Sequence, residues 1–454
     1  LLPQAAAVEI GAHRALGQDR ELNLVVQRLV SDPALGADVL LAAADAAQRS
    51  GRPDAAGGLV DRVLQRQPDL AGALLRKASI AFSERRLDEA RSTLRRLVET
   101  NPQDPYARIA LARVAEAQGD TPRAREELQQ AVTSRPAALE PALMLAALEL
   151  RADQPQAATR VLDRMLAAAP ADGVAANAAG LLLLGNRRID EARTRFRTAV
   201  EQKDSVAEYW FNLGRTQIAV DDRAAARQSF ARAVAARPDW LDANVAAIRL
   251  TLIAKDAGAA MELARKLADR MPGNPVAWLM IGEVHATERR FGEASSAFAK
   301  SFAQQPTVAA AIGDHLARRS GGLARPDLPL INWLALDPRD VSARRRLADF
   351  YLVTGAGGDA IRQFEKLIQI APNDVSALNN LAWLMATRDV ARAEVLVRRA
   401  YSIAPQNAAV ADTLGWVLVQ ASRFPEARDL LSRAAEGLPQ DRGVRYRYAL
   451  ALAR

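Results

Sequence analysis

Proline recurs along this chain with a period of 34 residues, and this period constrains the fold more than any other feature. Intervals of 34 residues, or twice 34, separate the members of a first series: Pro68, Pro102, Pro136, Pro170, Pro238, Pro272 and Pro306. Pro33 precedes this series, and intervals of 32 to 34 residues continue it at Pro338, Pro372, Pro405 and Pro439. A fixed period of this length indicates stacked copies of one supersecondary unit.

Small and large apolar residues repeat in phase with these prolines. Ala226 stands twelve residues before Pro238, Phe230 stands eight before it and Gly214 twenty-four before it, and most other repeats carry residues of similar size at these places. Small residues let two helix backbones approach, and a large residue fills the adjacent gap. Each unit is therefore predicted to be a pair of packed helices, with proline ending the second helix because it supplies no amide hydrogen.

Acidic or amide side chains directly after the prolines are expected to cap the next helix, because their oxygens accept hydrogen bonds from free backbone amides. The residues in question are Asp69, Asp239 and Asn373. One pair of helices cannot bury its apolar face alone, so the pairs are expected to stack along one axis.

This pattern resembles the tetratricopeptide repeat family over essentially the whole chain. The segment 208–238 carries residues at the family's signature positions: Trp210, Leu213, Gly214, Ala226, Phe230, Ala233 and Pro238. The resemblance implies an all-α fold, a right-handed superhelical solenoid of about 13 helix-turn-helix repeats, and a role in binding protein partners or peptides in a concave groove.

One repeat is irregular, and it suggests a division of the chain. Gly321, Gly322, Pro326 and Pro329 stand where a second helix should form, and this composition does not allow a regular helix there. We therefore expect an N-terminal array at 1–319, a degenerate repeat or hinge at 320–338, and a C-terminal array at 339–454. A drifted repeat with a tolerated loop is the alternative interpretation.

Composition argues against catalysis and metal binding. The chain has no cysteine and three histidines, namely His13, His285 and His315, and no pair of these has metal-ligand spacing. We expect no enzyme activity, no cofactor and no metal. The net charge of +8 comes from basic residues that are spread along the chain and mixed with acids, so nucleic acid is not an expected partner.

Function is therefore expected on the inner face of the first helices. The expected groove residues are Phe211, Arg215, Arg345, Asp349, Asn379, Trp383, Asp412 and Trp416. Trp383 and Trp416 hold the same position in adjacent repeats, so two indoles could stack on a peptide or on sugar rings. The alternative is that both indoles are partly buried against neighbouring helices. The arginines around Arg345 form a basic cluster, interpreted either as a site for an anionic partner or as a solvated helix face.

A narrower resemblance concerns the stretches 377–384 (ALNNLAWL) and 412–419 (DTLGWVLV). They are similar to the end of the tetratricopeptide repeat lipoprotein of PEP-CTERM/exosortase and exopolysaccharide systems. This resemblance implies a scaffold in the bacterial envelope, periplasmic or associated with the outer membrane through a missing anchor or a partner, since the sequence begins at Leu1 without Met. The alternatives are a cytoplasmic adaptor of a regulatory or secretion complex, and a groove that binds polysaccharide directly.

Overall fold

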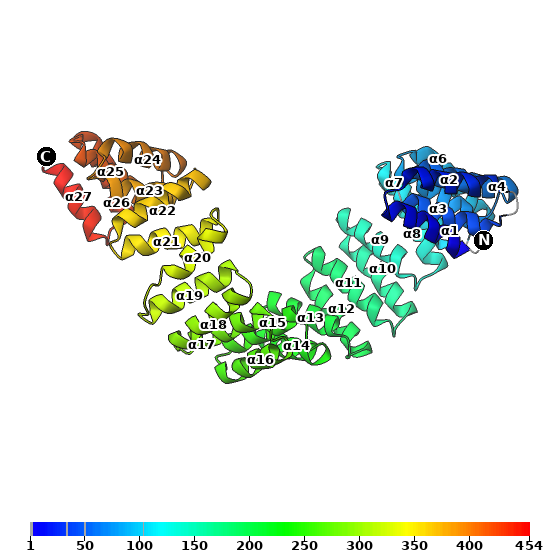
Figure 1. Ribbon diagram of the computed structural model, residues 1–454, viewed down its shortest axis with the longest axis horizontal. Coiled ribbons are helices and arrows are strands. Elements are labelled where there is room, and N and C mark those ends of the chain that lie inside the picture. Colours follow the sequence, from blue (N-terminus) through cyan, green and yellow to red (C-terminus); the bar gives the residue numbers. More distant parts are fainter. Residues whose placement is uncertain (1–2, 33–34, 50, 103) are drawn as a thin grey trace. The chain divides into compact units, whose positions relative to one another are not determined.

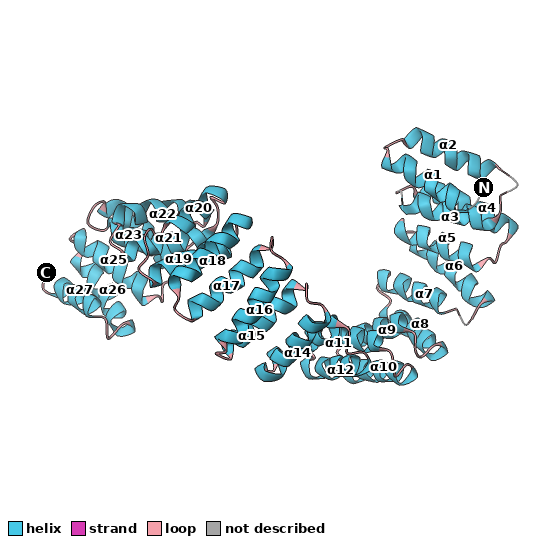
Figure 2. Ribbon diagram, turned by 60° about the horizontal axis from the view of Figure 1, so that its bottom comes forward, coloured by secondary structure: helices cyan, strands magenta, loops and turns pink. Residues whose placement is uncertain are grey.

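Helix is the only regular secondary structure in the part of the chain that the computed structural model describes, residues 3–32, 35–49, 51–102 and 104–454 (Figures 1 and 2). The predicted all-α fold is confirmed. The chain divides into two compact units, Leu1–Ala236 and Arg237–Arg454, called unit 1 and unit 2 below. The boundary that the sequence suggested at residues 320–338 lies within unit 2, and it stays a prediction.

The described residues of unit 1 form these helices: α1 Pro3–Ala15, α2 Asp19–Ser31, α3 Ala37–Arg49, α4 Pro53–Arg66, α5 Ala71–Ser83, α6 Leu87–Thr100, α7 Pro105–Ala117, α8 Thr121–Ser134, α9 Leu139–Arg151, α10 Pro155–Ala168, α11 Gly173–Gly185, α12 Ile189–Gln202, α13 Ala207–Ala219 and α14 Arg223–Ala236. Those of unit 2 form these: α15 Leu241–Ile253, α16 Ala257–Arg270, α17 Pro275–Thr287, α18 Phe291–Gln304, α19 Val308–Ser320, α20 Leu328–Leu336, α21 Val341–Val353, α22 Gly357–Ile370, α23 Val375–Met385, α24 Val390–Ile403, α25 Ala408–Gln420, α26 Phe424–Gly437 and α27 Arg442–Leu452.

Within each unit the helices stack in chain order, as a solenoid does. Each helix packs against the next, and first helices of neighbouring pairs also touch, such as α9 with α11 and α23 with α25. Second helices end two residues before a marker proline, as α14 ends at Ala236 before Pro238. Pro33 lies outside the described residues. In the part of the chain described, no helix is both long and apolar enough to cross a lipid bilayer.

The small and large residues of the period meet inside each pair, as predicted. A β-carbon added to Gly214 would lie 2.8 Å from Cε1 of Phe230, and one added to Gly282 would lie 2.6 Å from Cε1 of Phe298. Real β-carbons do not come this close to another carbon. Glycine is therefore required where these phenylalanine rings cross the first helix. Ala226, on the facing helix, is fully buried.

The predicted helix caps are wrong by one residue. Asp69, Asp239 and Asn373 do not cap, because the chain needs one further residue before the first helical turn begins. The capping side chains stand two residues after the proline instead. Asp104, Asp340, Asp374 and Asp441 accept hydrogen bonds from backbone amides of the first turn of α7, α21, α23 and α27.

The irregular repeat lacks a regular second helix at its start, as expected. Residues 321–327 form turns, with Gly322 and Arg325 at φ of 64° and 51°. The second helix, α20, begins only at Leu328 and spans nine residues, whereas α18 spans 14. Pro329 falls in the first turn of α20, where a helix tolerates proline because the missing amide hydrogen would have had no partner.

Candidate functional site

The fifth and ninth residues of α21, α23 and α25 form the candidate site, here called the odd-helix face. They are the six groove residues that the sequence named in unit 2: Arg345, Asp349, Asn379, Trp383, Asp412 and Trp416. Residues four apart lie one above the other on a helix, so each pair shares one face of its helix. Since α23 and α25 touch, four of these side chains belong to one contiguous surface.

The two indoles of this face are in contact with each other. The ring centroids of Trp383 and Trp416 lie 6.5 Å apart, with the ring planes tilted by 37°. This separation falls within the range of favourable aromatic pairs, about 4.5–7 Å. Trp383 remains 39% exposed, whereas Trp416 is half-buried. The sequence left open whether the indoles are exposed or partly buried, and each of the two descriptions fits one of them.

Arg447 of α27 holds the indole pair in place. Its Nε and Nη2 atoms donate to Oδ1 and Oδ2 of Asp412 at 2.8 and 2.6 Å. The same guanidinium carbon lies 4.9 Å from the ring centroid of Trp383, a cation–π arrangement. Asp412 is only 6% exposed, and burial raises the pKa of its carboxyl while Arg447 lowers it. The fork of two hydrogen bonds fixes the guanidinium plane, and the plane supports the indole.

Asn379 places an unused acceptor beneath this surface. It stands one helical turn before Trp383 on the same face of α23. Its side-chain oxygen Oδ1 is buried, and no described residue donates a hydrogen bond to it. A buried oxygen without a donor costs free energy, on the order of 1–3 kcal/mol. Because this oxygen is buried, it lies beneath the surface that a partner would contact.

Arg345 and Asp349 of α21 differ in their contacts within the chain. Arg345 donates to Asp374, the residue that caps α23, so its charge is matched within the chain. Asp349 occupies in α21 the place that the indoles hold in the next two first helices. It is half-buried, and burial raises the pKa of its carboxyl, while the positive charges of Arg345 and Arg346 lower it.

Phe211 and Arg215 belong to unit 1, so they are described apart from the other six residues. They are the fifth and ninth residues of α13, the same places in the repeat. The ring of Phe211 packs edge-on against Phe230, with the centroids 5.3 Å apart. This packing ties Phe211 to the interior of its own repeat. Arg215 is exposed.

Some arginines of the basic cluster around Arg345 have partners within the chain, as Arg345 does with Asp374. Arg344 is buried and donates to the side chain of Gln363 at 2.8 Å and to the carbonyl of Pro338. Arg318 pairs with Asp314 at 2.9 Å, and Arg325 pairs with its neighbour Asp327. Arg319, Arg339 and Arg346 are exposed, so the choice between an anion-binding patch and a solvated helix face stays open.

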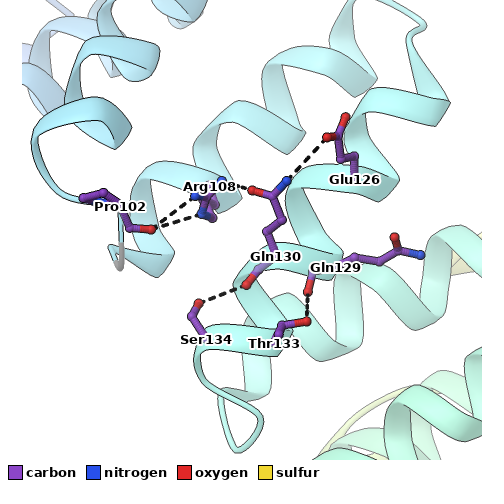
Figure 3. A pocket seen from close by; sticks show the side chains of 7 residues that line it. All are labelled: Pro102, Arg108, Glu126, Gln129, Gln130, Thr133 and Ser134. Carbon is purple, nitrogen blue, oxygen red and sulfur yellow. Dashed lines mark hydrogen bonds between the residues drawn. The ribbon is translucent and has the colours of Figure 1, made fainter.

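One open pocket lies in unit 1 and is lined mainly by polar side chains (Figure 3). It has a volume of about 620 Å³ and is lined by Pro102, Arg108, Glu126, Gln129, Gln130, Thr133 and Ser134. Arg108 donates to the carbonyl of Pro102 at 3.2 and 3.3 Å and to the side-chain oxygen of Gln130. The hydroxyls of Thr133 and Ser134 donate to carbonyls of their own helix. Most of its polar side chains thus bond within the chain, whereas Figure 3 draws no bond at the side chain of Gln129.

In the described residues, no three His, Cys, Asp or Glu side chains are grouped so that they could hold a metal ion.

Family models described as "Tetratricopeptide repeat" match residues 36–114, and residues 109–173 and 177–239. The chain contains tetratricopeptide repeats. Such repeats are protein-interaction scaffolds, which agrees with the expected class of function.

Several solved structures align with most of the chain at low identity. A structure of Naa15/Naa10 bound to HypK-THB is 15% identical, with a TM-score of 0.39, and the alignment covers 91% of this chain and 65% of that one. For yeast Tom70 the identity is 13%, the TM-score 0.38 and the coverage 92% and 95%. For the APC/C hetero-tetramer Cut9–Hcn1 the values are 14%, 0.36, 100% and 96%. No curated protein sequence matches.

Sequence reasoning missed Arg447, although the tetratricopeptide repeat offers a signal for it. Side chains 34 or 35 residues apart meet across neighbouring first helices, as Arg249 does with Glu283 and Asn212 with Asn177. Arg447 follows Asp412 by 35 residues, so opposite charges at this spacing predict the pair. The sequence contains no comparable indication of the unbonded Asn379 Oδ1, because its state depends on the absence of a donor on the described helices around it.

Proposed function

We propose that the protein is a scaffold that binds a protein partner on the odd-helix face of unit 2, at the Trp383–Trp416 pair. The carrying observation is that an indole 39% exposed to water is held in a fixed orientation by Arg447. The contacts with Trp416 and Arg447 stabilise the chain, and they also hold the exposed part of the indole in one orientation. This fixed orientation lowers the entropic cost of binding, because the surface needs no ordering when a partner arrives.

The residue types at this surface support a protein partner. Tryptophan and arginine are the residues that most often dominate the binding free energy of protein interfaces, and here they form one packed group. Flat apolar area with a few polar groups that give direction is the usual composition of a ligand site.

The test uses two substitutions and a matched control. Trp383→Ala and the double variant with Trp416→Ala should reduce partner capture from native lysate at least tenfold, while circular dichroism stays unchanged. Trp278→Ala is the control, because Trp278 in α17 also carries a stacked cation, with Lys300 Nζ 4.4 Å from its ring centroid. Capture should persist in this control variant. Full capture by the double variant, or an equal loss in the control, would contradict the proposal.

We further propose that this scaffold works in the bacterial envelope, within an exopolysaccharide or PEP-CTERM system. The support is the resemblance of residues 377–384 and 412–419, the two segments that carry the indoles. Fractionation of native cells should find the protein in the periplasm or with the outer membrane, and recovery in the cytoplasm would favour the adaptor alternative. Polysaccharide binding is the other alternative. It would appear as retention on immobilised exopolysaccharide that the double tryptophan variant loses.

A further inference from the structure

The irregular repeat of unit 2 carries polar residues where other repeats carry small or apolar ones. His315 is the eighth residue of α19, the place that Gly214 and Gly282 hold in α13 and α17. Asp314, the seventh, replaces the buried Leu213 of α13. Both polar residues are buried, at 2% and 6% exposure. Two polar residues at these buried positions of α19 change the surface against which the second helix of the repeat, α20, packs.

These residues anchor the loop that replaces the first turns of the second helix. His315 Nδ1 lies 2.7 Å from the carbonyl oxygen of Pro326, and the imidazole packs edge-on against Phe350. Arg318 donates to the carbonyl of Ala324 at 3.1 Å. The imidazole thus fixes the end of the loop that precedes α20. Helix α20 is nine residues long instead of 14, which makes it about 7 Å shorter.

A pocket of about 210 Å³ lies between α18, α19 and the start of α20, which follow one another in Figure 1. Its lining is Ala299, Phe302, Ala303, Ala310, Ala311, Asp314, Arg318, Leu328, Pro329 and Asn332. The alanines of α19 and Pro329 are buried and form the floor, whereas Ala303 and Asn332 are exposed and form the mouth. The pocket is thus mostly apolar and open at one side.

Asp314 places one unused acceptor in this pocket. Ser295 Oγ donates to its Oδ1 at 2.5 Å, and Arg318 Nε donates to the same oxygen at 2.9 Å. Within the described part of the chain, no donor reaches the second oxygen, Oδ2, and the side chain lines the pocket. The charge of Asp314 is already matched by Arg318, so a neutral donor suits Oδ2 better than a second cation.

We propose that this pocket binds an aromatic ring carrying one hydroxyl group, a phenol, whose hydrogen is donated to Asp314 Oδ2. An engineered apolar cavity of about 150 Å³ in another protein holds benzene, so a pocket of about 210 Å³ has room for one ring with a small substituent. The apolar walls contact the ring, and the acceptor fixes its orientation. The site is independent of the indole pair, because it lies on other helices.

The test compares p-cresol with toluene on the full chain by ligand-observed NMR titration. Toluene lacks only the hydroxyl. A purely apolar pocket would prefer toluene, because the desolvated hydroxyl of p-cresol would have no partner. A hydrogen bond to a carboxylate reverses the order, and we expect p-cresol to bind about tenfold more tightly. Equal affinities, tighter binding of toluene, or no binding of p-cresol would overturn the proposal.

Two variants tie the binding to this pocket. Ala303→Leu adds bulk at the exposed mouth and should weaken p-cresol at least tenfold without loss of helix content. Ala235→Leu is the matched control, because Ala235 is exposed and is the thirteenth residue of α14, as Ala303 is of α18. This control should bind p-cresol like the natural chain. Undiminished binding by Ala303→Leu would place the phenol elsewhere and overturn the assignment.

A second comparison identifies the source of the ring. The capped peptide acetyl-Gly-Tyr-Gly-amide presents the same phenol as a side chain, and its Phe analogue lacks the hydroxyl. Binding of the tyrosine peptide, lost in Ala303→Leu, would assign the pocket to a tyrosine of a partner protein. Binding of p-cresol without binding of the peptide would assign it to a small free phenol.

Discussion

Replacing Gly282 by alanine tests the packing rule of the repeat at its tightest point. The added β-carbon would lie 2.6, 2.7 and 2.9 Å from three ring carbons of Phe298. The ring cannot turn away, because it is 3% exposed and also lies against Gly313 of α19, where an added β-carbon would meet it at 2.7 Å. Helix α17 or helix α18 must therefore shift.

The expected loss follows from two opposing terms. Overpacking of a dense core costs about 1–3 kcal/mol. Alanine in place of glycine inside a helix returns up to about 1 kcal/mol. Gly282→Ala should therefore lower the free energy of unfolding of this region by up to about 2 kcal/mol. Gly292→Ala is the control in the facing helix, where nothing lies within 4 Å of the added carbon, so only the favourable term applies.

Hydrogen exchange of the full chain, read by mass spectrometry on peptides from α17 and α18, measures this change locally. Exchange should become faster in Gly282→Ala and slower in Gly292→Ala. Adding Phe298→Leu to Gly282→Ala should recover at least 1 kcal/mol of the overpacking cost, because Ala78 and Ala112 stand opposite Leu94 and Leu128 in other repeats. Slower exchange in both glycine variants would refute the packing rule.

Three further predictions concern other parts of the chain. Arg447→Ala leaves the buried carboxylate of Asp412 unpaired and should cost about 3 kcal/mol, seen as faster exchange in α27; Arg447→Lys should give an intermediate loss. Burial lowers the pKa of His315 in the folded chain. As the pH falls, the imidazole is therefore protonated in the unfolded chain before it is protonated in the folded chain. The stability that the neutral imidazole contributes is lost as the pH falls below about 6.5. Between pH 7.5 and 5.5 the thermal midpoint should fall more for the natural chain than for His315→Gln, and parallel curves would contradict this assignment. Ala226→Leu and Gly214→Leu should each cost about 1–3 kcal/mol, and an unchanged thermal midpoint would show that the repeat register is wrong.

The fold was predictable because small and large residues recur at the same positions in most repeats. Gly214 facing Phe230 follows from spacing alone, since the distance along the chain fixes which faces of two paired helices meet. The predicted capping residues were wrong by one position. The packing of the next helix sets how many residues connect it to the proline, and the sequence does not show this number. Asp374, not Asn373, reaches the free amides of α23.

The candidate site was predictable only in part. The positions of Trp383 and Trp416 follow from the period of the repeat. Their contact depends on the side-chain orientation of each indole, and Arg447 sets that of Trp383. The pocket beside α20 required the structure. The sequence showed that a helix could not form at Gly321 and Gly322, but not which cavity the shortened helix would leave.

The central claim is that a partner binds on the odd-helix face of unit 2, and a hydrogen-exchange footprint tests it most directly. The full chain should be compared alone and in complex with the protein partner captured from native lysate. The account predicts slower exchange in α23, α25 and α27 of the complex, with little change in the second helices α24 and α26. Protection confined to other helices, with α23 and α25 unchanged, would contradict it.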